Sequence, residues 1–228
     1  MIKAVSKKIT GGIESYLKRI FGLMTSAVLV TALTTFIMLI TGAFTTLITS
    51  SGGLSIAYYI IVFAGFGLSI WAQMRAFSMK PTTAMLLLFL YSIFMGIAIT
   101  PMILVSRIIA LVLAAVMFAC MALFGYKTVK DLSFLGVFLL LGMIGLILVG
   151  IVSMFFPMGE TFSQIVCLIG VLVFALFAAY DMQTLKNAYY TLSNGEQKDQ
   201  LAVLGALHMY ISFVAMFEYL LGLLNSRD

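Results

Sequence analysis

The chain has 228 residues, of which 63% are hydrophobic and 9% are charged, and its formal net charge is +5. A soluble domain carries about 25% charged residues, so this composition excludes a soluble globular protein and indicates a polytopic membrane protein. The positive charge could suggest a nucleic-acid partner, but its distribution is typical of loops that set membrane topology, and we expect no nucleic acid to bind.

Residues 1–19 are predicted to form a basic cytoplasmic segment ahead of a membrane domain at 20–228. The segment is partly amphipathic, which suits contact with anionic lipid headgroups. Its charges could equally serve only to set the topology of the first helix. The basic residues are Lys3, Lys7, Lys8, Lys18 and Arg19.

Seven apolar segments follow, and each is long enough to cross a hydrocarbon core of about 30 Å as a helix. They predict an all-α membrane protein, a bundle of seven transmembrane helices. Polar or flexible stretches separate them, including Thr100-Pro101 between the third and fourth segments. The predicted helices are 20–49, 55–75, 82–100, 103–126, 132–156, 162–185 and 201–224.

The basic residues indicate the orientation of these helices. With the N-terminus inside, every Lys and Arg of the 13 except Arg107 and Arg227 lies on the cytoplasmic side. This bias predicts a multi-pass protein with a cytoplasmic N-terminus. The short loops favour a bacterial plasma (inner) membrane, with the lipid bilayer as the main partner.

Helix 132–156 carries a series of small residues, which let neighbouring helices approach closely in lipid. We therefore expect this helix to lie at the centre of the bundle, and a dimer face is the alternative. The residues are Gly136, Gly142, Gly145, Gly150 and Ser153.

Asp181 is the strongest candidate for a functional residue. It lies near the end of the apolar segment 162–185, and an aspartate at the centre of a membrane helix costs about 2.5–3.5 kcal/mol, with less toward the ends. Such residues typically mark ion or proton sites. The structural alternative is that Asp181 caps a helix end or pairs with Lys186 at the interface.

The last helix contributes three more polar candidates. His208, the single histidine, and Ser212 are four residues apart and share one face. Glu218 is six residues beyond Ser212, which rotates it about 240° to another face and places it nearer the outer surface. His208 is either a titratable group or a packing residue bonded to a carbonyl. Glu218 is either a secondary acidic site or a group that reaches the outer headgroups.

Arg75 ends the second helix on the cytoplasmic side, at the level expected for Asp181. An Arg–Asp pair would offset part of the burial cost of both charges. It would also form a latch that protonation or a competing cation could open. The alternative is that Arg75 is only a positive-inside anchor.

Three other seven-helix or intramembrane classes fit less well. A retinal-binding protein needs a lysine in the last helix, and 201–224 has none. An aspartyl protease needs a second aspartate there. Ser212 and His208 on one helix lack an evident oxyanion hole for a serine protease. We therefore expect no enzymatic activity and no cofactor.

Four motifs carry a resemblance to a known family. They are Lys130-Asp131-Leu-Ser-Phe-Leu, Gly96-Ile-Ala-Ile-Thr-Pro101, Tyr180-Asp181 with the Gln183 to Lys186 tail, and Ala206-Leu207, Tyr210 and Phe213. Together they resemble the Bax inhibitor-1 family over roughly residues 20–224.

The resemblance implies a seven-helix bundle with the last helix at its centre and, in bacterial members, a pH-sensitive leak of Ca²⁺. In the family mechanism two aspartates, in helices six and seven, share a proton or pair with an arginine of helix two. Asp181 matches the first aspartate and Arg75 matches the arginine. Ser212 stands where the family has its second aspartate. We hypothesise that His208, one turn away, partly replaces this missing titratable group.

The sequence therefore predicts a pH-modulated Ca²⁺ leak with Asp181 as its gate and as the candidate Ca²⁺ ligand. Ca²⁺ would be the transported ion. The alternative is a non-transporting membrane interaction protein that regulates membrane proteases or stress and cell-death responses. In that role a membrane protein would be the partner, and loss of the second aspartate would be harmless. We expect a monomer.

Overall fold

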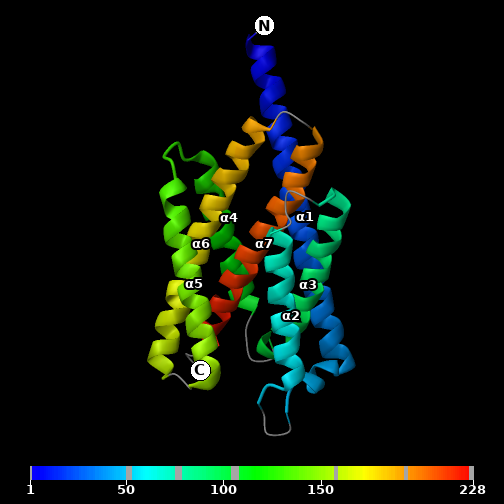
Figure 1. Cartoon of the computed structure of the whole chain (residues 1–228), viewed down its shortest axis with the longest axis vertical. Coiled ribbons are helices and arrows are strands. Elements are labelled where there is room, and N and C mark those ends of the chain that lie inside the picture. Colours follow the sequence, from blue (N-terminus) through cyan, green and yellow to red (C-terminus); the bar gives the residue numbers. More distant parts are fainter. Residues whose placement is uncertain are drawn as a thin grey trace. The chain divides into compact units, whose positions relative to one another are not determined.

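The computed structural model describes residues 2–49, 53–74, 79–103, 108–156, 159–192 and 195–225. Within these ranges the chain is helical, with one isolated β-bridge between Ile48 and Leu54 and no strand. A 3₁₀ helix, η1 (Ala43–Leu47), accompanies seven α-helices (Figure 1). These are α1 (Ile2–Thr41), α2 (Ile56–Met74), α3 (Pro81–Ile103), α4 (Ile108–Lys127), α5 (Ser133–Phe155), α6 (Glu160–Thr191) and α7 (Gly195–Asn225).

Six of the seven α-helices are long and apolar enough to cross a membrane, by length and composition. The remaining helix, α2, contributes a shorter apolar stretch, Ile56–Ser69. The prediction of an all-helical multi-pass membrane protein is therefore confirmed. Seven membrane crossings with the last helix at the centre stay a prediction.

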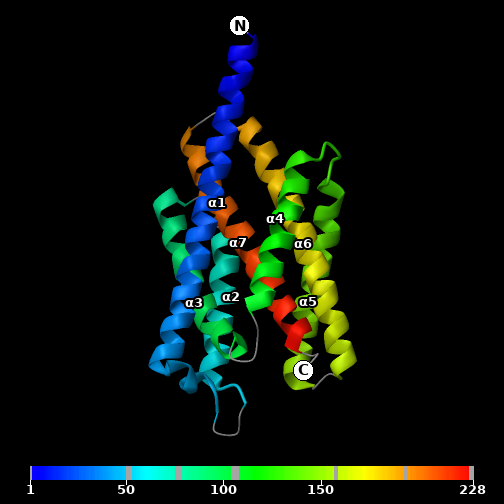
Figure 2. The ribbon, with the colours of Figure 1, turned by 180° about the vertical axis from the view of Figure 1, so that it is seen from behind.

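The first helix departs most from its predicted bounds. α1 is continuous across the predicted boundary at residue 19, and its 40 residues correspond to about 60 Å, twice the hydrocarbon core. Its N-terminal end extends beyond the start of α3 (Figure 2). The predicted end at residue 49 was wrong because Gly42 adopts a left-handed conformation with φ 69°, which ends the helix before η1.

Two further boundaries also differ. α3 continues through Pro101 to Ile103, because a proline close to a helix end removes only one backbone hydrogen bond. The predicted break at Thr100-Pro101 was therefore placed too early. α6 extends to Thr191, six residues past its predicted end, into a stretch too polar to read as a membrane helix.

The chain divides into two compact units, which are described separately. The first comprises Met1–Leu104 with Ala188–Tyr210, and the second comprises Val105–Asn187 with Ile211–Asp228. Both α6 and α7 contribute residues to each unit.

Hydroxyl groups join the helices of the first unit. Thr31 and Thr35 of α1 donate to the carbonyl oxygens of Ser92 and Gly96 on α3, at 3.1 and 2.8 Å. The Thr31 hydroxyl also bonds the hydroxyl of Tyr210 from α7, and Tyr210 is fully buried. Polar side chains inside a helical membrane unit thus find partners on neighbouring helices.

Replacing Tyr210 with phenylalanine is expected to lower the free energy of unfolding by about 0.5–1.5 kcal/mol. The effect is modest because Thr31 keeps the carbonyls of Ala27 and Ser92 as acceptors, at 3.0 and 3.1 Å. Reversible unfolding in mixed micelles measures it. Tyr190→Phe is the control, since Tyr190 is 58% exposed. Equal stability of the two variants would show that the Tyr210 hydroxyl contributes nothing.

Charged and aromatic groups cluster at one end of the first unit. Arg19 of α1 forms an ion pair with Asp199 of α7. The rings of Tyr16 and Tyr189 lie 5.0 Å apart, and the Lys198 ammonium lies 4.1 Å from the centre of the Tyr189 ring. The ion pair attaches the first turns of α7 directly to α1, and Tyr189 of α6 contacts both helices.

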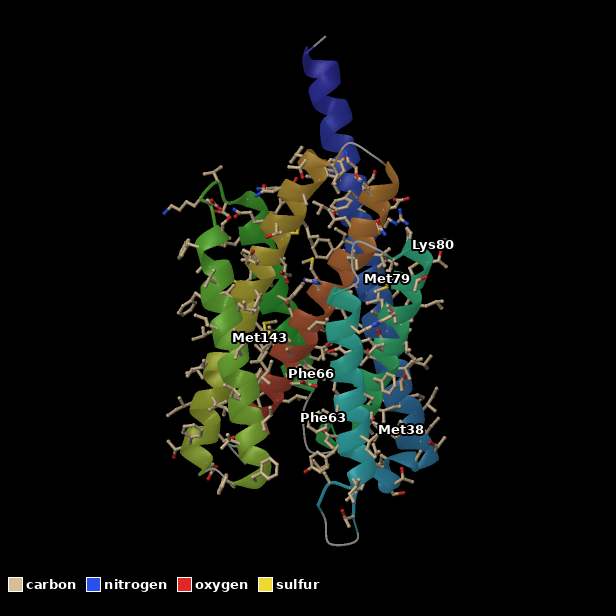
Figure 3. The ribbon with its side chains drawn as sticks, in the orientation of Figure 1. Met38, Phe63, Phe66, Met79, Lys80 and Met143 are labelled. Atoms are coloured by element: carbon tan, nitrogen blue, oxygen red, sulfur yellow. The ribbon has the colours of Figure 1, made fainter. Side chains whose placement is uncertain are left out.

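The start of α3 is attached to the same part of α7. Gln200 donates a hydrogen bond to the backbone carbonyl of Met79. Figure 3 shows Met79 and Lys80 next to the first turn of α3, where Met79 is buried and Lys80 is exposed. The beginning of α7 is therefore held from two sides within its unit.

Only part of the predicted small-residue series on α5 packs tightly. An added Cβ at Gly136 would lie 2.8 Å from the Tyr180 hydroxyl of α6, and one at Gly142 would lie 3.3 Å from a valine of the same helix. No atom lies within 4 Å of such a Cβ at Gly145 or Gly150. The predicted central position of this helix was wrong, since only 11% of its most apolar stretch is buried.

Candidate functional site

The structure brings Asp181 and Ser212 together within the second unit. Asp181 lies on α6 and is 9% exposed, and Ser212 lies on α7 and is 5% exposed. The Ser212 hydroxyl donates to Oδ2 of Asp181 over 3.1 Å. A buried carboxylate is costly unless hydrogen bonds satisfy it, so this bond helps Asp181 to remain inside the unit.

Asp181 lies level with the last turn of α4. An added Cβ on Gly125 would overlap the carbonyl of Ala179, and α4 ends at Lys127. α6 itself continues ten residues past Asp181 to Thr191. Asp181 is therefore at the level of the loop that joins α4 to α5, although it is far from the end of its own helix.

The predicted alternative pairing of Asp181 with Lys186 is not formed. The Lys186 ammonium donates to the backbone carbonyls of Tyr126 and Thr128, at 2.7 and 3.5 Å. It also lies 5.6 Å from the centre of the Tyr126 ring. This lysine satisfies carbonyls at the end of α4, which a helix leaves without intrahelical partners.

Gln183 is buried two residues after Asp181. Its side-chain oxygen accepts the backbone N–H of Leu132 over 2.8 Å, and its amide nitrogen donates to the carbonyl of Lys130 over 2.8 Å. Both polar ends of the side chain are thus bound to the α4–α5 loop.

Asp131 adds a fixed charge to this loop. Its Oδ1 accepts the hydroxyl and the backbone N–H of Ser133, at 2.6 and 2.9 Å. These hydrogen bonds hold the pKa of the Asp131 carboxyl below its ordinary value. The exposed carboxylate therefore stays ionised at neutral pH and differs in environment from Asp181.

The remaining predicted site residues are Arg75, His208 and Glu218. Arg75 lies outside the described residues, so its pairing with Asp181 stays a prediction. His208 is half-buried on α7 and belongs to the first unit, so its coupling to Asp181 also stays a prediction. Glu218 is half-buried in the second unit, six residues beyond Ser212 and on a different face of α7.

α6 and α7 also pack closely beyond the Asp181–Ser212 bond. An added Cβ on Gly170 would lie 2.5 Å from the ring of Tyr219, and one on Gly222 would lie 2.8 Å from the sulfur of Cys167. Cys167 carries a free thiol, as does Cys120. The hydrogen bond is thus one end of an extended helix–helix contact.

Within the described ranges no group of three or more His, Cys, Asp and Glu side chains could hold a metal ion. Ca²⁺ takes six to eight oxygen ligands, usually with several charges. Asp181 and Ser212 supply too few of them for a tight site.

The contacts of Gln183, Lys186 and Gly125 with neighbouring segments were not predicted from the sequence, where Lys186 was considered only as a partner of Asp181. A buried amide and a lysine in the turns that follow an intramembrane acid were a usable signal, as was a glycine in the last turn of an apolar helix. What each residue contacts depends on the position of the α4–α5 loop, which hydropathy does not reveal.

A family model described as inhibitor of apoptosis-promoting Bax1 matches residues 13–228. The chain belongs to the Bax inhibitor-1 family. It is 30% identical over 226 residues to the inner membrane protein YbhL of Escherichia coli, covering 95% of this chain and 93% of that protein. An uncharacterised protein of Rickettsia prowazekii is 31% identical over 172 residues, 74% of this chain and 72% of the relative. The family resemblance predicted from the motifs is confirmed.

Proposed function

We propose that this Bax inhibitor-1 family protein is a pH-modulated leak for Ca²⁺ and other cations, closed by the hydrogen bond between Ser212 and Asp181. The observation that carries the proposal is a buried carboxyl group that accepts a hydroxyl from a neighbouring membrane-spanning helix over 3.1 Å. Such a bond changes strength with the protonation state of the acid. The leak activity implied by the family supports the same function.

The hydrogen bond is strongest when Asp181 is ionised, because a charge-assisted hydrogen bond is about twice as strong as a neutral one. Protonation of Asp181 therefore weakens the attachment of α6 to α7 by about 1 kcal/mol, which is about fivefold in an equilibrium constant. Cation flux should rise as the pH falls.

Ca²⁺ flux into dye-loaded proteoliposomes tests the proposal between about pH 6 and pH 8. Wild-type flux is expected to rise about fivefold on acidification. Asp181→Asn should stay at the acid level across this range, because its neutral amide imitates the protonated acid. Asp131→Asn is the matched control and should keep the wild-type pH dependence, since the Asp131 carboxylate is exposed.

An Asp181→Asn variant that titrates like the wild type would contradict the proposal. His208→Ala belongs in the same assay, since an unchanged pH dependence would remove His208 from the mechanism.

The lack of an acidic cluster in the described parts of the chain favours the non-transporting interaction protein as the second candidate. Wild-type protein that reconstitutes fully but passes no cation at any pH would make that function the leading one.

A further inference from the structure

The end of α4 and the α4–α5 loop contact α6 on the face opposite Asp181. Gln183 and Lys186 follow Asp181 by two and five residues, which rotates them about 200° and about 140° around the helix axis. Asp181 faces Ser212 on α7, whereas Gln183 reaches the loop and Lys186 reaches the end of α4 and the first loop residue. One turn of α6 is thus held from both sides.

Gln183 fixes the level of α6 relative to the start of α5. The first N–H groups of a helix have no intrahelical acceptor, and the side-chain oxygen of Gln183 accepts one of them, that of Leu132. The amide nitrogen of the same side chain bonds the carbonyl of Lys130. Two opposed hydrogen bonds to one buried amide leave little freedom for α6 to slide or rotate.

Lys186 fixes the same turn relative to the end of α4. Its ammonium bonds the carbonyls of Tyr126 and Thr128, where the partial negative charge of the helix terminus favours a cation. Close contacts complete the grip, because Gly125 and Gly136 bring α4 and α5 against Ala179 and Tyr180.

We infer that Gln183 and Lys186 are positioning residues, which set the level and rotation of α6 so that the Asp181 carboxyl meets the Ser212 hydroxyl. The inference rests on the proposed function for its effect on cation flux, but its structural content can be tested without flux. Neither residue needs to touch a passing ion. Both act through the end of α4 and the α4–α5 loop.

Disulfide trapping measures the positioning directly. Cys120→Ala and Cys167→Ala remove the native thiols, and Asp181→Cys with Ser212→Cys then reports contact of the two positions by the rate of oxidative cross-linking. Adding Gln183→Leu or Lys186→Met should slow cross-linking about tenfold, because hydrogen bonds that hold α6 are lost. Lys186→Arg should restore most of the rate, since it keeps the cation.

Matched controls separate positioning from a general loss of charge or amide. Lys127→Met removes an exposed lysine at the end of α4, and Gln197→Leu removes an exposed glutamine at the start of α7. Both should leave the cross-linking rate unchanged. Gln183→Glu retains an oxygen for the Leu132 N–H, so it should give an intermediate cross-linking rate. This variant tests the same position if Gln183→Leu does not fold.

Hydrogen exchange at Leu132 and the pH profile of flux complete the experiment, with Asp181 and Ser212 intact. The Leu132 amide should exchange faster in Gln183→Leu than in the wild type. The cation flux through Gln183→Leu should lose its pH dependence, whereas the flux through Gln197→Leu should keep it. Unchanged cross-linking in both Gln183→Leu and Lys186→Met would overturn the inference whatever the flux. Slower cross-linking in a protein that shows no wild-type flux would support the positioning role and reject the leak.

Discussion

Replacing Ser212 with aspartate is expected to reverse the sign of the pH dependence of cation flux. In the wild type the contact between α6 and α7 is strongest when Asp181 is ionised and accepts the serine hydroxyl. In Ser212→Asp two carboxyl groups meet at the same place. They attract each other while one proton is shared and repel when both are ionised.

The reversed dependence should also be the steeper one. Two unit charges about 4 Å apart near a protein surface repel by about 4 kcal/mol, which exceeds the difference of about 1 kcal/mol between the two hydrogen bonds. Flux through Ser212→Asp should therefore rise at least about tenfold with increasing pH. The proteoliposome assay measures both slopes in one experiment.

Two controls isolate the charge from the shape of the new side chain. Ser212→Asn has nearly the shape of Ser212→Asp but stays neutral and can donate to Asp181, so it should keep the wild-type sign. Ser212→Asp combined with Asp181→Asn moves the single carboxylate to α7, and this double variant should also keep the wild-type sign of the pH dependence. A Ser212→Asp variant with the wild-type sign would mean that this contact does not close the leak.

Much of the helical framework could be predicted from hydropathy, because an apolar helix must span a bilayer of fixed thickness. The predicted helix ends were wrong where local backbone conformation ended a helix early or where a helix continued into a polar stretch. Gly42 ends α1 through its left-handed backbone, and no hydrophobic pattern marks that choice. α6 passes its predicted end into a polar stretch, where Lys186 binds carbonyls at the end of α4 and in the loop that follows it.

The candidate site was only partly accessible to sequence reasoning. The family motif places Ser212 opposite Asp181, and the two side chains do form a hydrogen bond. Helix periodicity assigns Glu218 to a different face of α7 from Ser212, since a rotation about the axis follows from spacing alone. It could not assign Lys186, whose carbonyl partners on α4 and in the loop that follows it are about 60 residues away in the chain.

Gly125 is where a single added methyl group should damage both the fold and the site. Its Cβ would overlap the carbonyl of Ala179 on α6, and a backbone atom cannot turn aside as a side chain can. Gly125→Ala should therefore cost about 3 kcal/mol or more in the free energy of unfolding, despite the better helix propensity of alanine. Unfolding in mixed micelles measures the loss.

Gly150→Ala on α5 is the matched control, since no atom lies within 4 Å of its added Cβ. It should be neutral or more stable by up to about 1 kcal/mol. Because Ala179 precedes Asp181 by two residues, separating α4 from α6 should also weaken the bond to Ser212 and raise flux at high pH. Gly125→Ala with the stability of Gly150→Ala would show that α4 and α6 can separate freely, and that the grip on the Asp181 turn does not depend on this glycine.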